Sequence, residues 1–297
     1  MPADPCPWCA FPLPRSAGAT AWRVERCPAC RVGVTRPWPD DAQLDAAYAA
    51  YRPAEGRFGG PLDAVLRRSR ATLAARIDRL APPGPVLDIG AGDGTLVAAL
   101  RDRGRQAIGL ERTAAPVPHV HDATVAELDG PFGAIVLWHA LEHLRDPAAT
   151  LAAAAQRLQP GGVLVVAVPD LSSLQARVFG ARWLALDLPR HLVHLPGDAL
   201  VGRLRELGLA VERRSAWRGG QAVFGWLHGL VGAAPGHPDL YDALRRPAAR
   251  MQGQPAPQRV AALVLAALLT PVAAACAAIE IALGHGGSIE VEARRHP

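Results

Sequence analysis

The stretch Pro85–Gly104, PVLDIGAGDGTLVAALRDRG, decides the fold of this 297-residue chain. Its apolar run Val86–Ile89 predicts a buried strand, and the glycine-rich Gly90–Gly94 predicts a tight loop. The next residues, Thr95–Arg103, predict a helix that the last glycine of the stretch ends. A second apolar run, Ala107–Leu110, then predicts another strand. This order predicts a nucleotide-binding βαβ unit with a right-handed crossover.

Two classes of ligand compete for such a loop, because its glycines let a ligand approach the backbone closely. The dinucleotide fingerprint needs a glycine where this chain has Thr95, which leaves less room for a pyrophosphate. The alternative is the pattern Asp-x-Gly-x-Gly-x-Gly, which puts the carboxylate of Asp88 where it suits the ammonium group of an amino-acid moiety. Glu111, directly after the second strand, can accept hydrogen bonds from two ribose hydroxyls. These residues indicate S-adenosylmethionine as the ligand. The three glycines of the pattern are Gly90, Gly92 and Gly94.

From about Leu80 to Leu209 the sequence resembles the class I S-adenosylmethionine-dependent methyltransferases, in the branch related to the ubiquinone-biosynthesis O-methyltransferases. The resemblance rests on Glu111 and on four segments, VLDIGAGDGTL, HDATVAELDG, FGAIVLWHALEHLRDP and LQPGGVLVVAVPD. It implies an α/β fold, a Rossmann-like, doubly wound sheet of seven strands with the last strand antiparallel. The residues Ser288–Arg294 are expected to supply that last strand.

The resemblance also implies further contacts with the cofactor. Asp122 is expected near the adenine amino group, with Ala123 beside the ring and Trp138 among the cofactor-binding residues. A competing interpretation makes Asp122 the N-cap of a helix, because ATVAEL follows it. Both interpretations stay open at the level of the sequence.

The segment WHALEHL, Trp138–Leu144, follows the expected fourth strand and therefore faces the transferable methyl group. Methyltransferases that act on adenine or glutamine amino groups commonly carry Asn/Asp-Pro-Pro-Tyr there, so this subclass is disfavoured. A hydroxyl acceptor benefits from a general base, and histidine has a suitable pKa. The candidate bases are His139, His143 and His191, with His194 nearby in the segment DLPRHLVHL.

Two other interpretations of this segment remain. It resembles the small-RNA 2′-O-methyltransferases, in which a Glu-x-x-Glu-His motif and a later histidine hold Mg²⁺. Here His139 replaces the first glutamate of that motif, and imidazole favours softer ions than Mg²⁺. Alternatively, Glu142 and His143 only belong to the first turn of a helix whose leucines are buried.

Near the N-terminal end, four cysteines form the spacing C-x2-C-x17-C-x2-C. Each C-x2-C pair lets two thiolates reach one ion, and two pairs complete a tetrahedral shell suited to Zn²⁺. Four protein ligands leave no open position, so the zinc ion is expected to be structural. The cysteines are Cys6, Cys9, Cys27 and Cys30, and residues 1–36 are predicted to form a zinc ribbon.

Residues 37–60 are expected to form a linker and a short helix that Asp40 or Asp41 caps. This helix would carry Tyr48 and Tyr51, either packed on the main domain or at a substrate entrance. The expected methyltransferase domain covers residues 61–216 and is completed by residues 287–297.

An apolar helical insertion, residues 217–286, is expected to separate these two parts of the domain. It contains Val260–Ile279, twenty residues without a charge, which is long enough to cross a bilayer. However, Pro271 interrupts the run, and a single crossing would separate the last strand from its sheet. A helical hairpin at the membrane surface, a lid over the site and a homodimer contact are the alternatives for residues 221–283.

The net charge of +5 raises the question of nucleic-acid binding. Every basic residue apart from histidine is arginine, and acidic residues are interleaved with them, which favours solvated surface charge. We expect a cytoplasmic enzyme, with a location peripheral to the membrane as the alternative, whose acceptor is a small molecule of lipidic, polyketide-like or glycan-precursor type. The alternatives are an RNA methyltransferase that recognises RNA through its zinc ribbon, and a cofactor-binding regulatory protein without turnover.

Overall fold

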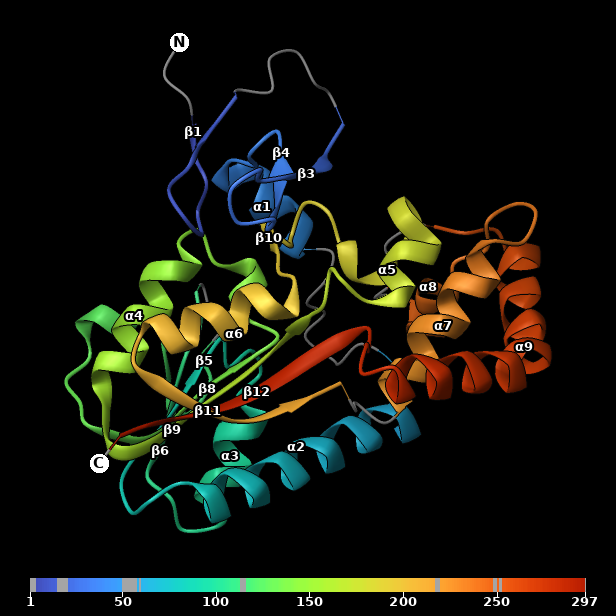
Figure 1. The fold of residues 1–297 in the computed structure, drawn as a ribbon. Coiled ribbons are helices and arrows are strands. Elements are labelled where there is room, and N and C mark those ends of the chain that lie inside the picture. Colours follow the sequence, from blue (N-terminus) through green and yellow to red (C-terminus); the bar gives the residue numbers. More distant parts are fainter. Residues whose placement is uncertain are drawn as a thin grey trace.

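The computed structural model of the protein describes residues 4–14, 21–49, 58, 60–112, 116–216, 220–247, 250 and 253–296. At its centre lies a twisted sheet of seven strands (Figure 1). From one edge to the other, its strands are β11 (Leu209–Ser215), β12 (Ser288–Arg295), β9 (Leu158–Pro169), β8 (Phe132–Trp138), β5 (Val86–Ile89), β6 (Ala107–Leu110) and β7 (Val120–His121).

The strand directions confirm the predicted fold class. Strands β5, β6, β7, β8 and β9 run parallel to their neighbours, whereas β12 pairs antiparallel with both β9 and β11. The strands expected at Val86–Ile89 and Ala107–Leu110 have those bounds. The expected last strand is one residue longer, Ser288–Arg295. Because parallel strands present their carboxyl ends at one edge, Asp88, Glu111 and His139 lie along that edge.

Helices cover both faces of this sheet (Figure 1). On one face, α2 and α3 form a core with the side chains of β5 and β8, and on the other face α4 and α6 share a larger core with the same strands. The helices are α1 (Asp41–Ala49), α2 (Gly60–Leu80), α3 (Thr95–Arg101), α4 (Pro147–Arg157), α5 (Leu174–Phe179), α6 (Gly197–Glu206), α7 (Gly220–Gly232), α8 (Leu240–Leu244) and α9 (Ala256–Ala282). Short 3₁₀ helices are η1 (Val125–Glu127), η2 (Leu141–His143), η3 (Gly180–Arg182) and η4 (Leu184–Leu186).

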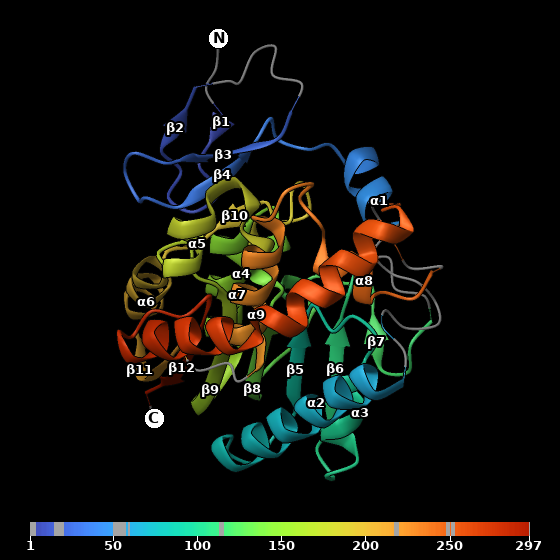
Figure 2. The ribbon, with the colours of Figure 1, turned by 90° about the vertical axis from the view of Figure 1, so that its right-hand side faces the viewer.

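The cysteine-rich segment forms two small sheets above the carboxyl ends of the large sheet (Figures 1 and 2). Their strands are β1 (Asp4–Pro5) and β2 (Pro12–Leu13) in one, and β3 (Arg23–Arg26), β4 (Gly33–Arg36) and β10 (Val193–His194) in the other. Strand β10 comes from the central domain and pairs with β4, so that Val193 faces Val34 and His194 faces Gly33. The ribbon and the central domain therefore share a sheet, and the ribbon side chains Trp8 and Val34 belong to the same core as β5 and β8.

Between β11 and β12 the described residues form the helices α7, α8 and α9, which lie beside the sheet (Figures 1 and 2). Helix α9 packs on α7 and α8. The sequence left a helical hairpin open for Val260–Ile279, but α9 is one continuous helix through this run. Figure 1 shows that α9 is bent, and Pro271 lies inside it, where proline removes a backbone hydrogen bond.

Candidate active site

The glycine loop that follows β5 has the backbone geometry for which the sequence selects glycine. Gly90, Gly92 and Gly94 have φ values of 81°, 57° and 72°, a region that other residues adopt at a cost. A Cβ on Gly90 would lie 2.3 Å from the Cβ of Ala140, so the loop touches the segment that carries the histidines. A Cβ on Gly92, by contrast, would meet nothing within 4 Å. The loop is therefore closed against the protein at Gly90 and open toward a ligand at Gly92.

Asp88, at the end of β5, is buried on the side of the sheet that α2 covers. The pKa of this carboxyl is raised to about 7, mainly by burial; the guanidinium of Arg70 on α2 opposes this rise, and the charges of Glu111 and Asp93 add to it. A buried carboxyl of this kind gains most from a ligand that brings a positive charge. A positively charged group is therefore electrostatically favourable at the position expected to meet the ammonium group of the cofactor.

Glu111, at the end of β6, contacts the glycine loop directly. Its Oε2 accepts a hydrogen bond of 2.8 Å from the backbone N–H of Gly92. The backbone N–H groups of Gly90 and Ala91 donate to the carbonyl of Leu110, which fixes the loop against the end of β6. The structure thus brings Asp88, Glu111 and the three glycines together, as the sequence predicted for a nucleoside-binding edge.

The structure separates the two interpretations of Asp122. The 3₁₀ helix η1 is capped by Thr124, whose side chain and backbone N–H both bond the carboxylate of Glu127. Asp122 is exposed and is not the cap, and Ala123 is half-buried. The cap interpretation was therefore wrong, and the expected adenine contact of Asp122 stays a prediction. Trp138, half-buried at the end of β8, has the Arg70 guanidinium 5.7 Å from its ring centroid.

The segment after β8 turns sharply at His139, whose φ is 55°. Its backbone N–H still bonds the carbonyl of Ala167 and so extends the ladder between β8 and β9. Its Nδ1 lies 3.2 Å from Oε1 of Glu142. Because the carboxylate accepts, Nδ1 carries the proton and Nε2 is left as the acceptor atom of the ring. His139 and Glu142 thus form a base and an orienting carboxylate.

Glu142 is the most buried acid of this segment, with 2% of its surface exposed. Burial alone would raise its pKa, but the hydrogen bond from His139 and the charges of the neighbouring imidazoles hold the pKa below its ordinary value. Its second oxygen, Oε2, is buried and has no hydrogen-bond partner among the described residues. A buried carboxylate oxygen without a donor indicates a place for a bound proton donor or a cation.

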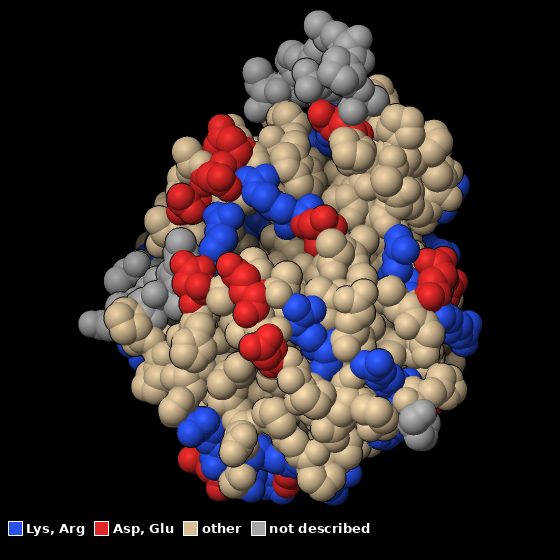
Figure 3. All heavy atoms as spheres, turned by 90° about the vertical axis from the view of Figure 1, so that its left-hand side faces the viewer, with Lys and Arg blue, Asp and Glu red and all other residues tan. Residues whose placement is uncertain are grey.

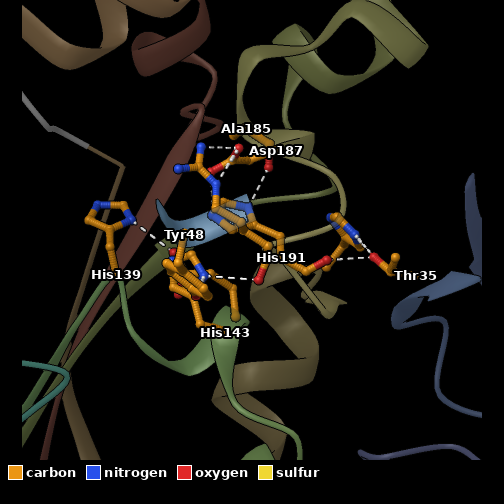
Figure 4. Close-up of polar contacts among 10 residues, drawn as sticks. Thr35, Tyr48, His139, His143, Ala185, Asp187 and His191 are labelled. Atoms are coloured by element: carbon orange, nitrogen blue, oxygen red, sulfur yellow. Dashed lines mark hydrogen bonds and ion pairs between the residues drawn. The ribbon is translucent and has the colours of Figure 1, made fainter. Parts of the chain in front are cut away.

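His143 and His191 lie next to Glu142, with ring centroids 4.6 Å apart (Figure 4). His143 Nδ1 is 3.0 Å from the carbonyl of Arg190, and His191 Nδ1 is 2.8 Å from the carbonyl of Ala185. A carbonyl accepts, so each ring donates to it through Nδ1–H. Burial and the neighbouring His191 lower the pKa of His143 to about 4, so that His143 is neutral at pH 7.

These three residues can bind a divalent cation, because one ligand atom from each of Glu142, His143 and His191 lies within 4.8 Å of the others. Imidazoles that donate their second N–H to a backbone carbonyl are the usual arrangement of histidine ligands. Figure 4 shows His139 apart from the pair formed by His143 and His191, so His139 serves the cluster only through its contact with Glu142. The same geometry suits a general base and a metal, and both interpretations remain chemically possible.

His194, the fourth candidate, has a structural position. It is buried, its pKa is lowered to about 3 by burial, and its Nε2 is 3.0 Å from the hydroxyl of Thr35 on β4. That hydroxyl donates to the carbonyl of His191 at 2.5 Å, so it accepts from the N–H of His194. His194 therefore joins the ribbon to the segment that carries His191.

The four cysteines lie together in the ribbon and are all free thiols. The Sγ atoms of Cys6 and Cys30 are 3.7 Å apart, as are those of Cys9 and Cys27. A disulfide is much shorter, at about 2.05 Å, whereas a tetrahedron with Zn–S bonds of about 2.3 Å has edges of about 3.8 Å. Both C-x2-C turns also have the same hydrogen bonds, from the residue four positions on to the carbonyl of Cys6 or Cys27. The thiolates thus fit a structural Zn²⁺.

Several residues around the site were not identified from the sequence. Tyr48 on α1 was considered only for packing or an entrance, yet its hydroxyl lies 2.9 Å from Nδ1 of His143. Tyr51 lies outside the described residues. Arg70 and Asp187 were missed; Asp187 lies 3.7 Å from Nε2 of His191 and binds the guanidinium of Arg190. No spacing rule relates positions 48, 70 and 187, because only the folded chain brings them to one edge of the sheet.

The charge on the face shown in Figure 3 bears on the nucleic-acid alternative, which requires a continuous basic track across ribbon and cleft. Figure 3 shows arginines and acidic residues interspersed around the hollow below the ribbon. Arg112 and Arg145 both pair with Asp41 on α1. These two arginines thus have an acidic partner.

Comparisons with known proteins agree with this geometry. A family model described as "Methyltransferase domain" matches residues 63–213, which is half of the chain. The ubiquinone biosynthesis O-methyltransferase of Xylella fastidiosa (strain 9a5c) is 33% identical over 157 residues, which cover 45% of this chain and 63% of that protein. The protein of the same name from Xanthomonas axonopodis pv. citri (strain 306) is 31% identical over 158 residues, which cover 45% of this chain and 66% of that protein. The chain thus spans less than two thirds of the length of these relatives.

The solved structure of a SAM-dependent methyltransferase from Archaeoglobus fulgidus is 17% identical, with a TM-score of 0.44, and the match covers 76% of this chain and 94% of that one. A likeness at this identity does not extend to the chemistry of the site.

Proposed function

This chain belongs to the methyltransferase-domain family, and from that premise we propose that it transfers the methyl group of S-adenosylmethionine to a hydroxyl group of a small molecule. One observation carries the proposal: the glycine loop touches, at Ala140, the segment in which Glu142 orients the imidazole of His139. A base held beside the cofactor loop is needed for a neutral hydroxyl acceptor and has no use for an acceptor that is already a strong nucleophile.

Each residue along the sheet edge is proposed to contact a different part of the cofactor. Asp88 would hold the ammonium group, Glu111 the ribose hydroxyls and Asp122 the adenine amino group, with Ala123 and Trp138 beside the rings. When bound, the sulfonium supplies an already activated methyl group, so the protein mainly has to align the acceptor and exclude water. The open side of the loop at Gly92 leaves room for such a ligand.

His139 is proposed as the general base. Its Nδ1–H donates to Glu142, so Nε2 accepts the proton of the acceptor hydroxyl. The acceptor oxygen would then take the methyl group that the bound cofactor supplies, with the sulfur of the cofactor as the leaving group, and the proton would stay on the imidazole of His139. The carboxylate of Glu142 stabilises the resulting positive charge. A carboxylate that is ionised, buried and already bonded to the ring suits this role.

His143 and His191 are proposed to bind the acceptor. One ligand atom from each of Glu142, His143 and His191 lies within 4.8 Å of the others, and this cluster would take either the donor groups of a hydroxylated acceptor or a divalent cation that the oxygens of the acceptor coordinate. Imidazole ligands fit Zn²⁺ or a similar ion better than Mg²⁺. Activity that survives a chelator able to remove this ion would exclude the cation.

The proposal is tested by transfer of tritiated methyl groups from labelled cofactor into a cell extract that is then separated into lipid, small-molecule and RNA fractions. We expect the label in the lipid or small-molecule fraction. Label in RNA alone would refute the proposed acceptor class, and binding without label in any fraction would favour a regulatory protein.

Two variants separate the roles within the site. His139→Ala should bind the cofactor with unchanged affinity in calorimetry yet transfer label at least about a hundredfold more slowly, which is the usual contribution of a general base. His296→Ala, at an exposed position, is the matched control and should behave as the unmodified protein. Equal rates for both variants would contradict the role of His139.

A further inference from the structure

Helix α9 exposes an unusual number of large apolar side chains. Its most buried residues are alanines and Glu280, and Leu265, Leu269 and Ile281 are partly buried against the core of the insertion. The exposed set, each between 44% and 69% exposed, is Val260, Leu263, Val264, Leu268, Val272 and Ile279. The buried set is Ala262, Ala266, Ala273, Ala277 and Glu280. A surface helix of a soluble domain places these residue types the other way round.

The insertion also buries charged side chains. The carboxylate of Glu280, fully buried, accepts hydrogen bonds from the backbone and side-chain amides of Gln175 and from the indole N–H of Trp226. Arg245 and Asp242 are also buried, with 2% and 1% of their surfaces exposed. The insertion thus holds charged groups beside its apolar core and leaves a row of large apolar side chains on α9 exposed, and an exposed apolar surface of this kind marks a contact with a partner or a membrane.

Helix α9 is the one described helix long and apolar enough to cross a membrane, with a mean hydropathy of 2.4 and 17% of its most apolar stretch buried. Its ends, however, are both held by the same folded body. Its N-terminal half packs on α8, and β12 begins six residues after α9 ends and pairs with β9 along seven positions. A helix tied to one body at both ends lies along a surface and does not span the bilayer.

The charged residues near the exposed face of α9 indicate the charge of the lipids that it contacts. Between Ala243 and Ile279 the sequence contains four arginines and no aspartate or glutamate. Arg246, Arg250 and Arg259 are half-buried near the start of α9; the guanidinium of Arg246 pairs with Asp63, and that of Arg259 donates to the carbonyl of Gln254. Arginines that flank an apolar face attract the phosphates of anionic lipids.

We propose that the outward face of α9 rests on the surface of an anionic lipid bilayer, with Leu263 and Leu268 entering the acyl boundary and Arg259 at the headgroups. The helix is then buried by lipid on the side that the protein leaves exposed, and the bend at Pro271 lets both halves follow the protein body. This membrane contact does not depend on the activity of the site.

The test uses the full chain and vesicles of phosphatidylcholine with an equal part of phosphatidylglycerol, compared with vesicles of phosphatidylcholine alone. The protein should float with the mixed vesicles and bind them at least about tenfold more tightly than the neutral ones, and added salt should reduce this difference. Leu263→Glu combined with Leu268→Glu should weaken binding to the mixed vesicles by about tenfold or more. Phe11→Glu, at another exposed apolar side chain on the ribbon, is the control and should bind as the unmodified protein.

Arg259→Gln is a second variant, which should weaken binding to the mixed vesicles and leave binding to neutral ones unchanged. Circular dichroism and the retained cofactor affinity show that each variant is folded. Failure of the unmodified protein to float, or equal binding of the Leu263→Glu/Leu268→Glu variant, would overturn the proposal. So would a lipid-free dimer in light scattering that this variant converts to a monomer, because a second copy would then cover the face.

Discussion

Replacing Asp88 by asparagine should make the protein more stable and a poorer binder of S-adenosylmethionine. The carboxyl is buried, and its pKa is raised by burial from 3.8 to about 7. The folded protein therefore binds more protons than the unfolded chain between these two values, and the free energy of unfolding falls as the pH rises from about 4 to about 7. The shift corresponds to about 4 kcal/mol of destabilisation once the group is ionised. Asp88→Asn should recover about 2–4 kcal/mol of this above pH 7.

The same raised pKa gives the cofactor affinity a definite pH dependence. Binding the ammonium group requires an ionised Asp88 and a protonated amine, whose pKa in the free cofactor is about 7.8. The product of the two ionised fractions is largest near about pH 7.4, and it is about sixfold lower at pH 6 and about ninefold lower at pH 9. Binding at pH 6 should also release about 0.9 proton, because the carboxyl must ionise.

Isothermal titration in buffers of different ionisation enthalpy measures both quantities on the same samples, and urea unfolding without cofactor measures the stability. Asp88→Asn should release no proton and should lose the acid limb of the pH profile. The reasoning would be refuted by a variant that is less stable than the unmodified protein at pH 8, or by an unmodified protein that binds equally well at pH 6 and pH 7.4 without releasing a proton.

Three further predictions concern the ribbon and the loop. In Cys6→Ser/Cys9→Ser, metal analysis should show the zinc lost, while calorimetry shows unchanged cofactor affinity; retained zinc would refute the ligand assignment. Thr35→Val leaves a buried N–H and a buried carbonyl unpaired and should cost about 2–4 kcal/mol in urea unfolding, whereas Thr35→Ser, which keeps the hydroxyl, should cost about 1 kcal/mol. Gly90→Ala should destabilise by about 2 kcal/mol or more because of its contact with a neighbouring Cβ, whereas Gly92→Ala should cost only about 1 kcal/mol but weaken cofactor binding; the reverse order in thermal unfolding would contradict the loop geometry.

The sheet could be predicted because its signals are local. A run such as Val86–Ile89 is buried on both faces of the sheet, the glycines mark the loop, and the right-handed crossover relates consecutive strands. The path of α9 was less accessible, since the sequence shows Pro271 but not whether the chain turns there or only bends. The packing of α7 and α8 against α9 decides this, and that packing is a tertiary property.

The residues of the site likewise fall into those that local sequence predicts and those that depend on tertiary packing. Asp88 and Glu111 follow predicted strands directly, so the order of the strands places them at one edge. The approach of His191 to Glu142 depends on the segment between α5 and α6, which has no periodic pattern and is held by β10 pairing with β4. A pairing between residues so far apart in the chain leaves no mark on the spacing of either segment. The role of Thr35 could not be anticipated for the same reason.

The register of β11 and β12 has a consequence for how this enzyme family can diversify. Ser215 faces Glu290 across the ladder, so β11 and β12 pair as the two strands of an antiparallel hairpin. All residues between the two strands form the connection of this hairpin. The free-energy cost of closing such a connection grows only slowly with its length. A tight turn in place of the three helices would therefore preserve the cofactor edge, and a different module could be grafted at the same point. The segment between β11 and β12 and the cofactor edge can then change separately, by recombination at one hairpin.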